Sequence, residues 1–170
     1  LISLLEHRIV PIINENDTVS VEELKFGDND RLSALVAALL PSDLLILLTT
    51  VDGLMKNFGT PEQEIISTVN EIDDSLRLLA SGTSNDAAVG GMKTKILAAE
   101  IATRSGIPMI IANGRKKDVL VSLMEGQEVG TLFEPDDSML PGRKRWIAFF
   151  HHPKGSLVVD EGAKTALIQK

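Results

Sequence analysis

The chain has 170 residues, 44% of them hydrophobic and 24% charged, with a net charge of -7 at pH 7. This length and composition are typical of a globular protein with one hydrophobic core, and the acidic balance argues against a protein built mainly to hold nucleic acid. Because the sequence contains no cysteine, a disulfide framework and a thiolate metal site are both excluded.

The ends of the sequence resemble interior parts of a protein. Leu1 to Leu5 reads as the tail of a helix, and Ala166 to Lys170 ends in the middle of an apolar pattern. We therefore interpret the sequence as an internal piece of a longer chain. The apolar runs are too short to cross a bilayer and the start carries no signal peptide, so we expect no membrane partner and a place in the cytoplasm.

Strand-like and helix-like patterns alternate along the first 134 residues. Strands are predicted at the apolar runs 8–13, 44–48, 64–69, 107–112 and 129–133, with an edge hairpin over 18–26. Helices are predicted over 28–40, 73–80, 92–105 and 118–125, and loops over 51–60 and 81–91. This alternation predicts an α/β fold, a three-layer αβα sandwich with a mainly parallel sheet.

The composition changes after Glu134. Proline, glycine and basic residues punctuate 135–154, which we interpret as a linker between a domain over 1–134 and the start of a second, truncated domain over 155–170. In the last segment a helix is predicted from Glu161 onward. The linker's basic run, Arg143 to Trp146, could touch RNA, but a solvated linker or a domain contact is the simpler interpretation.

Polar residues follow three of the predicted strands directly. In parallel sheets ligands bind outside the carboxyl ends of the strands. Asn14, Thr49 and Asn113 are therefore expected at one sheet edge, together with the start of the helix after Gly91. The histidines have no metal-ligand spacing with carboxylates, so no metal site is predicted from His7, His151 and His152.

The pair Gly90-Gly91 precedes the predicted helix that begins at Met92. Two residues without Cβ atoms let the backbone approach an anion, and the positive end of a helix favours one. At about 100° per residue, Lys95 shares a face with a row of alanines and is carried toward the strand ends, whereas Lys93 points away to solvent. An ordinary glycine loop before an ordinary helix is the alternative, and the spacing is not that of a Walker A motif.

Two clusters of asparagine and acidic residues stand early in the chain, at 14–17 and 28–30. Amide donors beside carboxylate acceptors can bind an α-amino and an α-carboxylate group together. An Asx-rich turn after a strand is the alternative for the first cluster, and a helix cap for the second. Asp30 could also hold a lysine in place or bind Mg²⁺ indirectly.

Three segments carry a resemblance to a known family, because they occur together in order and spacing. They are Val10 to Asp17, Phe26 to Ala34 and Gly90 to Lys95. The ordered set resembles the glutamate 5-kinases of the amino acid kinase superfamily, and the match continues through Val129 to Phe133. Asp160 to Ala163 is similar to the entry into that family's C-terminal PUA domain. The resemblance implies that only the C-terminal portion of the kinase domain is present and that its N-terminal part is absent.

The resemblance implies ATP-dependent phosphorylation of the γ-carboxylate of glutamate, the first step of proline biosynthesis. It implies that Asn14, Asp17 and Asn29 contact glutamate, that Asp30 orders the catalytic lysines, and that Lys95 stabilises the transferred phosphoryl group. Mg²⁺ would be carried on the nucleotide phosphates. The positions matched to the nucleotide side are Thr49, Thr50, Val89, Gly90, Gly91, Met92, Lys93, Thr94 and Lys95.

The chain departs from the family pattern in two places. Thr50 stands where the family usually has an aspartate, so a carboxylate is lost, and Ala88-Val89 stands where the family usually has Gly-Thr, so a hydroxyl donor is lost. The family also suggests a dimer or tetramer and feedback inhibition by proline. Because part of the phosphate site is missing, the isolated chain is expected to have no kinase activity.

Two alternatives remain open from the residues. One is another amino acid kinase that acts on aspartate, acetylglutamate or UMP. The other is a non-catalytic regulatory homologue, which the departures at Thr50 and Val89 motivate. Nucleic acid as a partner is unlikely at this acidic balance.

Overall fold

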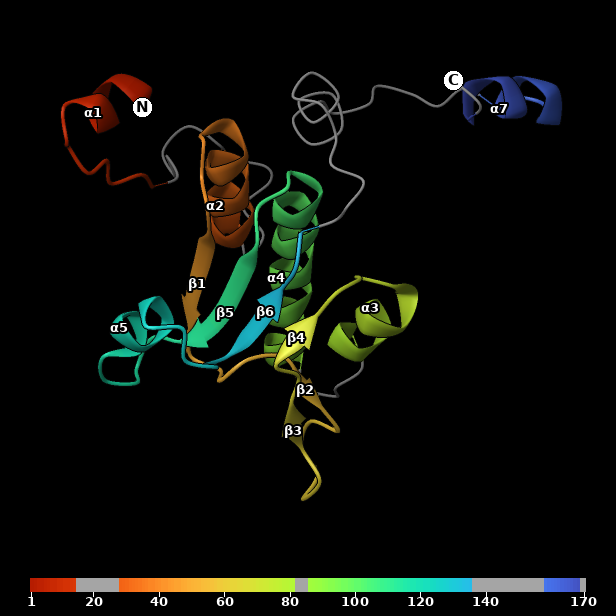
Figure 1. The fold of residues 1–170 in the computed structure, drawn as a ribbon. Coiled ribbons are helices and arrows are strands. Elements are labelled where there is room, and N and C mark those ends of the chain that lie inside the picture. Colours follow the sequence, from red (N-terminus) through yellow and green to blue (C-terminus); the bar gives the residue numbers. More distant parts are fainter. Residues whose placement is uncertain (15–27, 82–85, 136–157, 169–170) are drawn as a thin grey trace.

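The computed structural model describes residues 1–14, 28–81, 86–135 and 158–168 (Figure 1). The hairpin predicted over 18–26 lies outside these ranges. The predicted α/β class and the mainly parallel sheet are both confirmed. Across the described residues, every helix falls short of the length or the hydrophobicity that a membrane span requires.

The main sheet has four strands in the order β1-β5-β6-β4. Their bounds are Leu45–Thr49, Met109–Asn113, Thr131–Phe133 and Thr68–Val69 in that spatial order. The pairs β1–β5 and β4–β6 are parallel, and β5–β6 is antiparallel. The register pairs Thr49 with Asn113, so the last residues of the first two strands lie side by side, as the sequence predicts.

The antiparallel step between β5 and β6 follows from the connection between them. The helix α5 (Val119–Met124) is short, and the chain turns back at the edge where β5 ends. Gly130 enters β6 with φ +84, and a Cβ atom there would lie 2.1 Å from the carbonyl oxygen of Ile111. Only glycine permits this close approach of the two backbones.

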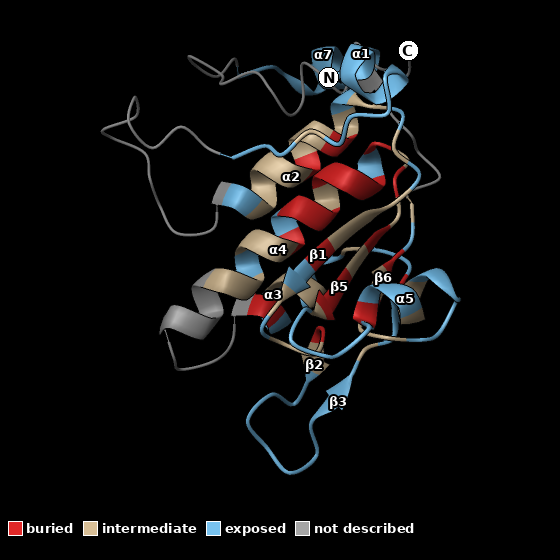
Figure 2. Cartoon of the chain, turned by 90° about the vertical axis from the view of Figure 1, so that its left-hand side faces the viewer, coloured by how far each residue is buried: buried red, intermediate tan, exposed pale blue. Residues whose placement is uncertain are grey.

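Two nearly parallel helices, α2 (Asp28–Leu39) and α4 (Asp86–Arg104), cover one face of the sheet (Figure 2). Their facing stripes are built of alanine. Ala34 and Ala37 of α2 are buried, and Ala98, Ala99 and Ala102 of α4 have no exposed surface. Small side chains on both helices let the helix axes approach closely, which brings polar side chains at the ends of the stripes within reach of each other.

The helix α3 (Asp74–Ser81) lies between β4 and α4 in the chain and packs beside α4. The carboxylate of Asp73 accepts a hydrogen bond from the backbone N–H of Leu76 at 2.8 Å, so Asp73 is the N-cap of α3. This hydrogen bond makes the largest contribution to lowering the pKa of Asp73 below its ordinary value. The sequence predicts that two helices stop before Gly106 and Gly126. The structure agrees, since α4 ends at Arg104, α5 ends at Met124 and both glycines have positive φ.

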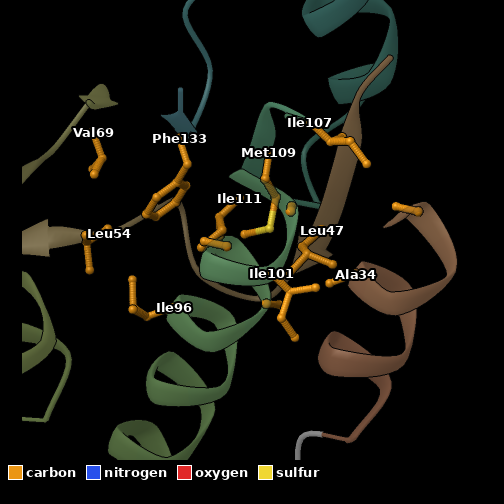
Figure 3. Close-up of a cluster of buried hydrophobic side chains, with 14 of the residues drawn as sticks. Ala34, Leu47, Leu54, Val69, Ile96, Ile101, Ile107, Met109, Ile111 and Phe133 are labelled. Atoms are coloured by element: carbon orange, nitrogen blue, oxygen red, sulfur yellow. The ribbon is translucent and has the colours of Figure 1, made fainter. Parts of the chain in front are cut away.

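The core lies between the sheet and these helices (Figure 3). Its largest fully buried side chains are Phe133, Leu54, Met109, Ile111 and Thr131. Leu47, Ile96 and Ile101 complete the contact between strands and helix α4. This packed layer fixes the height of α4 relative to the carboxyl ends of β1 and β5.

Three element predictions are wrong in detail. The run 8–13 is not a strand: Val10 and Ile12 are 83% and 97% exposed, and nothing among the described residues pairs with their backbone. β-branched residues favour a strand, but a strand forms only where a partner satisfies its backbone groups. The run 64–69 is two short strands, β3 (Glu64–Ile65) and β4, and the predicted loop over 51–60 contains β2 (Met55–Lys56), which pairs with β3.

Two short helices lie at the ends of the described chain. α1 (Ile2–Glu6) agrees with the predicted helix tail, and α7 (Glu161–Ile168) agrees with the predicted helix from Glu161. Asp160 caps α7, since its carboxylate accepts a hydrogen bond from the N–H of Ala163 at 2.8 Å. Both figures place α1 at the end of the sheet opposite to the carboxyl ends of β1 and β5.

Candidate active site

A cavity of about 230 Å³ lies at the carboxyl end of β1, between the loop that follows this strand and helices α3 and α4. Strand-end threonines and α4 residues form one part of its wall, and apolar side chains form the other. The lining residues are Thr49, Thr50, Val51, Gly53, Leu54, Met55, Phe58, Leu79, Ala80, Gly91, Met92 and Lys95. The sequence predicts this edge as the ligand site, and five of the predicted residues meet there.

Among the described residues of this lining, Lys95 carries the only charged group. Its Nζ donates a hydrogen bond to Oδ2 of Asp30 at 2.9 Å, and the two side chains are only 16% and 20% exposed. The same Oδ2 accepts a hydrogen bond from Oγ1 of Thr94 at 2.9 Å. The structure thus places a lysine on Asp30, across 65 residues of sequence.

The pair forms because two small-residue stripes end at these positions. Asp30 lies four residues before Ala34, on the face of α2 that packs against α4. Lys95 lies three residues before Ala98, on the facing stripe of α4. The close helix packing thus places a carboxylate and an ammonium group opposite each other, at the rim of the cavity.

The glycine pair differs from the prediction. Helix α4 begins at Asp86, so Gly90 and Gly91 lie inside the helix and not in a loop before it. The N–H groups of residues in the second turn bond to carbonyls of the first turn, and are not free for an anion. Each of the two glycines costs about 1 kcal/mol relative to alanine in a helix, whereas Ala87 and Ala88 are strong helix formers that favour an early start of α4.

Gly91 nevertheless faces the cavity. A Cβ atom built on it would meet nothing within 4 Å, so the space beside the helix backbone is open. Met92 lines the same cavity. Lys93 is exposed and lines a separate groove between α3 and α4, which agrees with the predicted direction of its side chain. Residue 89 belongs to the described backbone of α4, but its side chain lies outside the described residues.

The residues expected on the glutamate side are less well placed. Asn29 is exposed in the first turn of α2, next to Asp30. Asn14 is exposed in the segment that follows α1, and Asp17 lies outside the described residues. Of the three segments 14–17, 28–30 and 90–95, the structure brings the last two together, at Asp30, Thr94 and Lys95.

Three polar residues at the same edge escaped the sequence prediction as a group. Asp52 Oδ1 accepts hydrogen bonds from Nδ2 of Asn113 and from Nζ of Lys116, both at 2.9 Å. The amide of Asn113 and then the lysine hold the pKa of Asp52 below the ordinary aspartate value. The only sequence signal is that Asp52 and Lys116 each stand three residues after the last residue of a strand at this edge.

The cavity lining suits an anion better than a bare cation. No carboxylate is among the described lining residues, and the described ranges contain no group of three acidic or histidine side chains that could hold a metal ion. Mg²⁺ prefers few protein ligands and keeps phosphate and water oxygens. The residues therefore fit Mg²⁺ that arrives with phosphates, and not Mg²⁺ held directly by the protein.

Comparison with known proteins identifies the family. The model of the amino acid kinase family matches residues 1–113. The chain belongs to the amino acid kinase family. Its curated relatives include glutamate 5-kinases of Trichlorobacter lovleyi, 44% identical over 99% of the chain, and of Photobacterium profundum, 46% identical over 100% of it. The chain spans about half the length of these relatives, 45% and 46% respectively.

Two solved kinase structures are similar to a little over three fifths of the chain. A uridylate kinase from Archaeoglobus fulgidus is 24% identical, with a TM-score of 0.47 over 61% of this chain and 45% of that one. A carbamate kinase from Giardia lamblia bound to AMP-PNP is 27% identical, with a TM-score of 0.49 over 63% of this chain and 35% of that one.

Proposed function

We propose that the full-length protein transfers the γ-phosphoryl group of ATP to the γ-carboxylate of L-glutamate, in the first step of proline biosynthesis in the cytoplasm. The observation that carries the proposal is the Lys95–Asp30 pair at the rim of the strand-end cavity. The similarity to glutamate 5-kinases along the whole chain supports the choice of acceptor.

The chemistry needs positioning and neutralisation of charge more than covalent help from the protein. Both substrates are anionic, so they repel each other as they approach. In the proposal the ammonium of Lys95 lies between them and stabilises the charge that develops on the transferred group. Mg²⁺, bound to the nucleotide phosphates, would neutralise the remaining charge.

Asp30 is a positioning residue in this scheme. Its carboxylate restrains a long and flexible side chain in one orientation, so less entropy is lost when the phosphate arrives. Thr94 bonds to the same oxygen and restrains the carboxylate in turn. The remaining residues on the nucleotide side are Thr49, Thr50, Val89, Gly90, Gly91, Met92 and Lys93. Of these, Thr49, Thr50, Gly91 and Met92 line the cavity.

Glutamate would bind beside the start of α2. Asn29 adjoins Asp30 there, and Asn14 and Asp17 are proposed to complete the site with amide donors and a carboxylate for the α-amino group. Proline, which shares the α-amino and α-carboxylate groups of glutamate, would inhibit at this site. We further propose a homo-oligomer and no role for nucleic acid or a membrane.

A panel of acceptors tests the function. The full-length protein is expected to release ADP from ATP with glutamate, and not with aspartate, acetylglutamate or UMP. The measurement is a coupled ADP assay together with trapping of γ-glutamyl phosphate as the hydroxamate. ADP release with aspartate or UMP alone would contradict the proposal. Formation of γ-glutamyl phosphate by the isolated 170-residue chain would contradict only the expectation that this chain is inactive by itself.

A further inference from the structure

Asp52 lies behind the wall of the candidate nucleotide cavity. Its neighbours Val51 and Gly53 line the cavity, whereas Asp52 itself does not. The Asp52 side chain bonds instead to Asn113, the last residue of β5, and to Lys116 in the loop that follows. The loop after β1 is thereby joined to the loop after the neighbouring strand.

The same loop is fixed at its two ends. The N–H of Val51 donates to Oγ1 of Thr49 at 3.0 Å, and the N–H of Leu54 donates to the buried Oγ1 of Thr131 at 2.8 Å. Gly53 is packed so tightly that a Cβ atom would lie 2.7 Å from the same Thr131 oxygen. Between these anchors, Asp52 carries the only charged side chain of the loop 50–54.

We propose that Asp52, Asn113 and Lys116 form a positioning cluster that sets the shape of the nucleotide cavity. The proposal rests on the proposed function, because it takes the cavity to bind a nucleotide. The cluster holds the backbone of Val51 and Gly53 where it forms the wall. Loss of the Asp52 bonds lets this backbone turn outward and weakens nucleotide binding, although none of the three side chains lines the cavity.

The exposure of the pair separates this role from simple stabilisation. The side chains of Lys116 and Asp52 are 51% and 36% exposed. Half-exposed ion pairs add little to the stability of a fold. A large effect of their removal on nucleotide affinity, with a small effect on Tm, is therefore the signature of positioning.

The test measures the Kd of MgADP by calorimetry on the full-length protein and its variants. Asp52→Ala and Lys116→Met are each expected to raise Kd about threefold or more, the range typical of residues in contact with one network. Lys116→Arg is expected to keep the affinity for MgADP close to that of the unsubstituted protein, because the arginine keeps the positive charge. Lys117→Met is the matched control: Lys117 is exposed and makes no ion pair within the part of the chain that the structure describes.

Each outcome is decisive. If the unsubstituted protein binds MgADP and Lys116→Met binds it equally well, the positioning role is overturned and the proposed function stands. If Lys116→Met and Lys117→Met weaken MgADP binding equally, the loss comes from the lower positive charge of the protein, and the cluster has no positioning role. If the unsubstituted protein does not bind MgADP, the nucleotide cavity and the proposed function fail, and this proposal fails with them.

Discussion

Helix α4 carries one member of each of two buried or half-buried ion pairs, and the two pairs differ in what surrounds them. Lys95 bonds to Asp30 of α2 at 2.9 Å, and Glu100 bonds to Arg77 of α3 at 2.6 Å. Both pairs join α4 to a neighbouring helix. Lys95 also faces the strand-end cavity, whereas Glu100 lies away from it. Position, and not the strength of the pair, distinguishes a candidate site from a structural contact.

The partners of each cation support this distinction. Arg77 contacts a second acid, Asp74, at 2.7 Å, and its pKa is raised first by the bond to Glu100. The positive charge of Arg77 is thus paired with two carboxylates of the protein itself. A lysine ammonium has three donors, and Asp30 is the one partner that the described residues offer to Lys95. In the proposed function, the other donors of the Lys95 ammonium would bind a phosphate.

The strongest test of the comparison removes the cation at the cavity. Lys95→Ala in the full-length protein is expected to lower kcat at least about 100-fold, because a preorganised donor to the transition state is lost. Asp30→Asn is expected to lower kcat by about tenfold, since the ammonium stays but is no longer restrained. The measurement is steady-state kinetics with glutamate and ATP.

Lys93 provides the comparison for that experiment, because it lies two residues from Lys95 on another face of the helix. Lys93→Ala is expected to lower kcat far less than Lys95→Ala. Equal losses in the two variants would mean that helix charge in general, and not the group bonded to Asp30, supports the reaction. An unchanged kcat in Lys95→Ala would remove Lys95 from the mechanism.

A second test acts on the packing that creates the Lys95–Asp30 pair. Ala34 is fully buried between α2 and α4. Ala34→Leu is expected to lower the free energy of unfolding by about 1–3 kcal/mol, because the added methyl groups separate the two helices. The same separation moves Asp30 away from Lys95, so kcat falls as well, while the Arg77 contact with α4 is unaffected.

Urea unfolding and kinetics on the same protein sample measure both effects. Ala163→Leu is the control, since Ala163 is exposed on α7 and its replacement is expected to change the unfolding free energy by less than about 0.5 kcal/mol. A destabilised Ala34→Leu protein with normal kcat would show that the helix spacing does not set the geometry of the site.

Those parts of the candidate site that depend on the spacing of residues within one helix or strand could be predicted from the sequence. The acidic start of α2, the alanine stripe of α4 and the threonines after β1 each follow from spacing within one element. Their convergence follows from the rule that ligands bind at the carboxyl ends of parallel strands. Spacing alone left a helix cap open for Asp30, and it is the resemblance to the glutamate 5-kinases that links Asp30 to Lys95, although 65 residues separate them.

What the sequence could not predict depends on contacts between elements. The start of α4 at Asp86 reflects the balance between two alanines and two glycines, which spacing alone does not resolve. The segment 8–13 has the composition of a strand, but its state depends on a partner that the described residues do not supply. The Asp52 cluster joins two loops, so neither loop's sequence reveals it.

The smallest expected effect comes from the structural pair, and it completes the comparison. Arg77→Met keeps the aliphatic part of the side chain and removes only the charge that bonds to Glu100 and Asp74. Because Arg77 is 41% exposed, we expect Tm to fall by no more than about 3 °C and kcat to stay within about twofold of the unsubstituted protein. Thermal unfolding and kinetics measure these values.

A loss of kcat in Arg77→Met that approaches the loss in Lys95→Ala would have a different meaning. It would show that α3, which contributes Leu79 and Ala80 to the cavity wall, must be held in place for the reaction. The two ion pairs of α4 would then serve one site, and the distinction between them would fail.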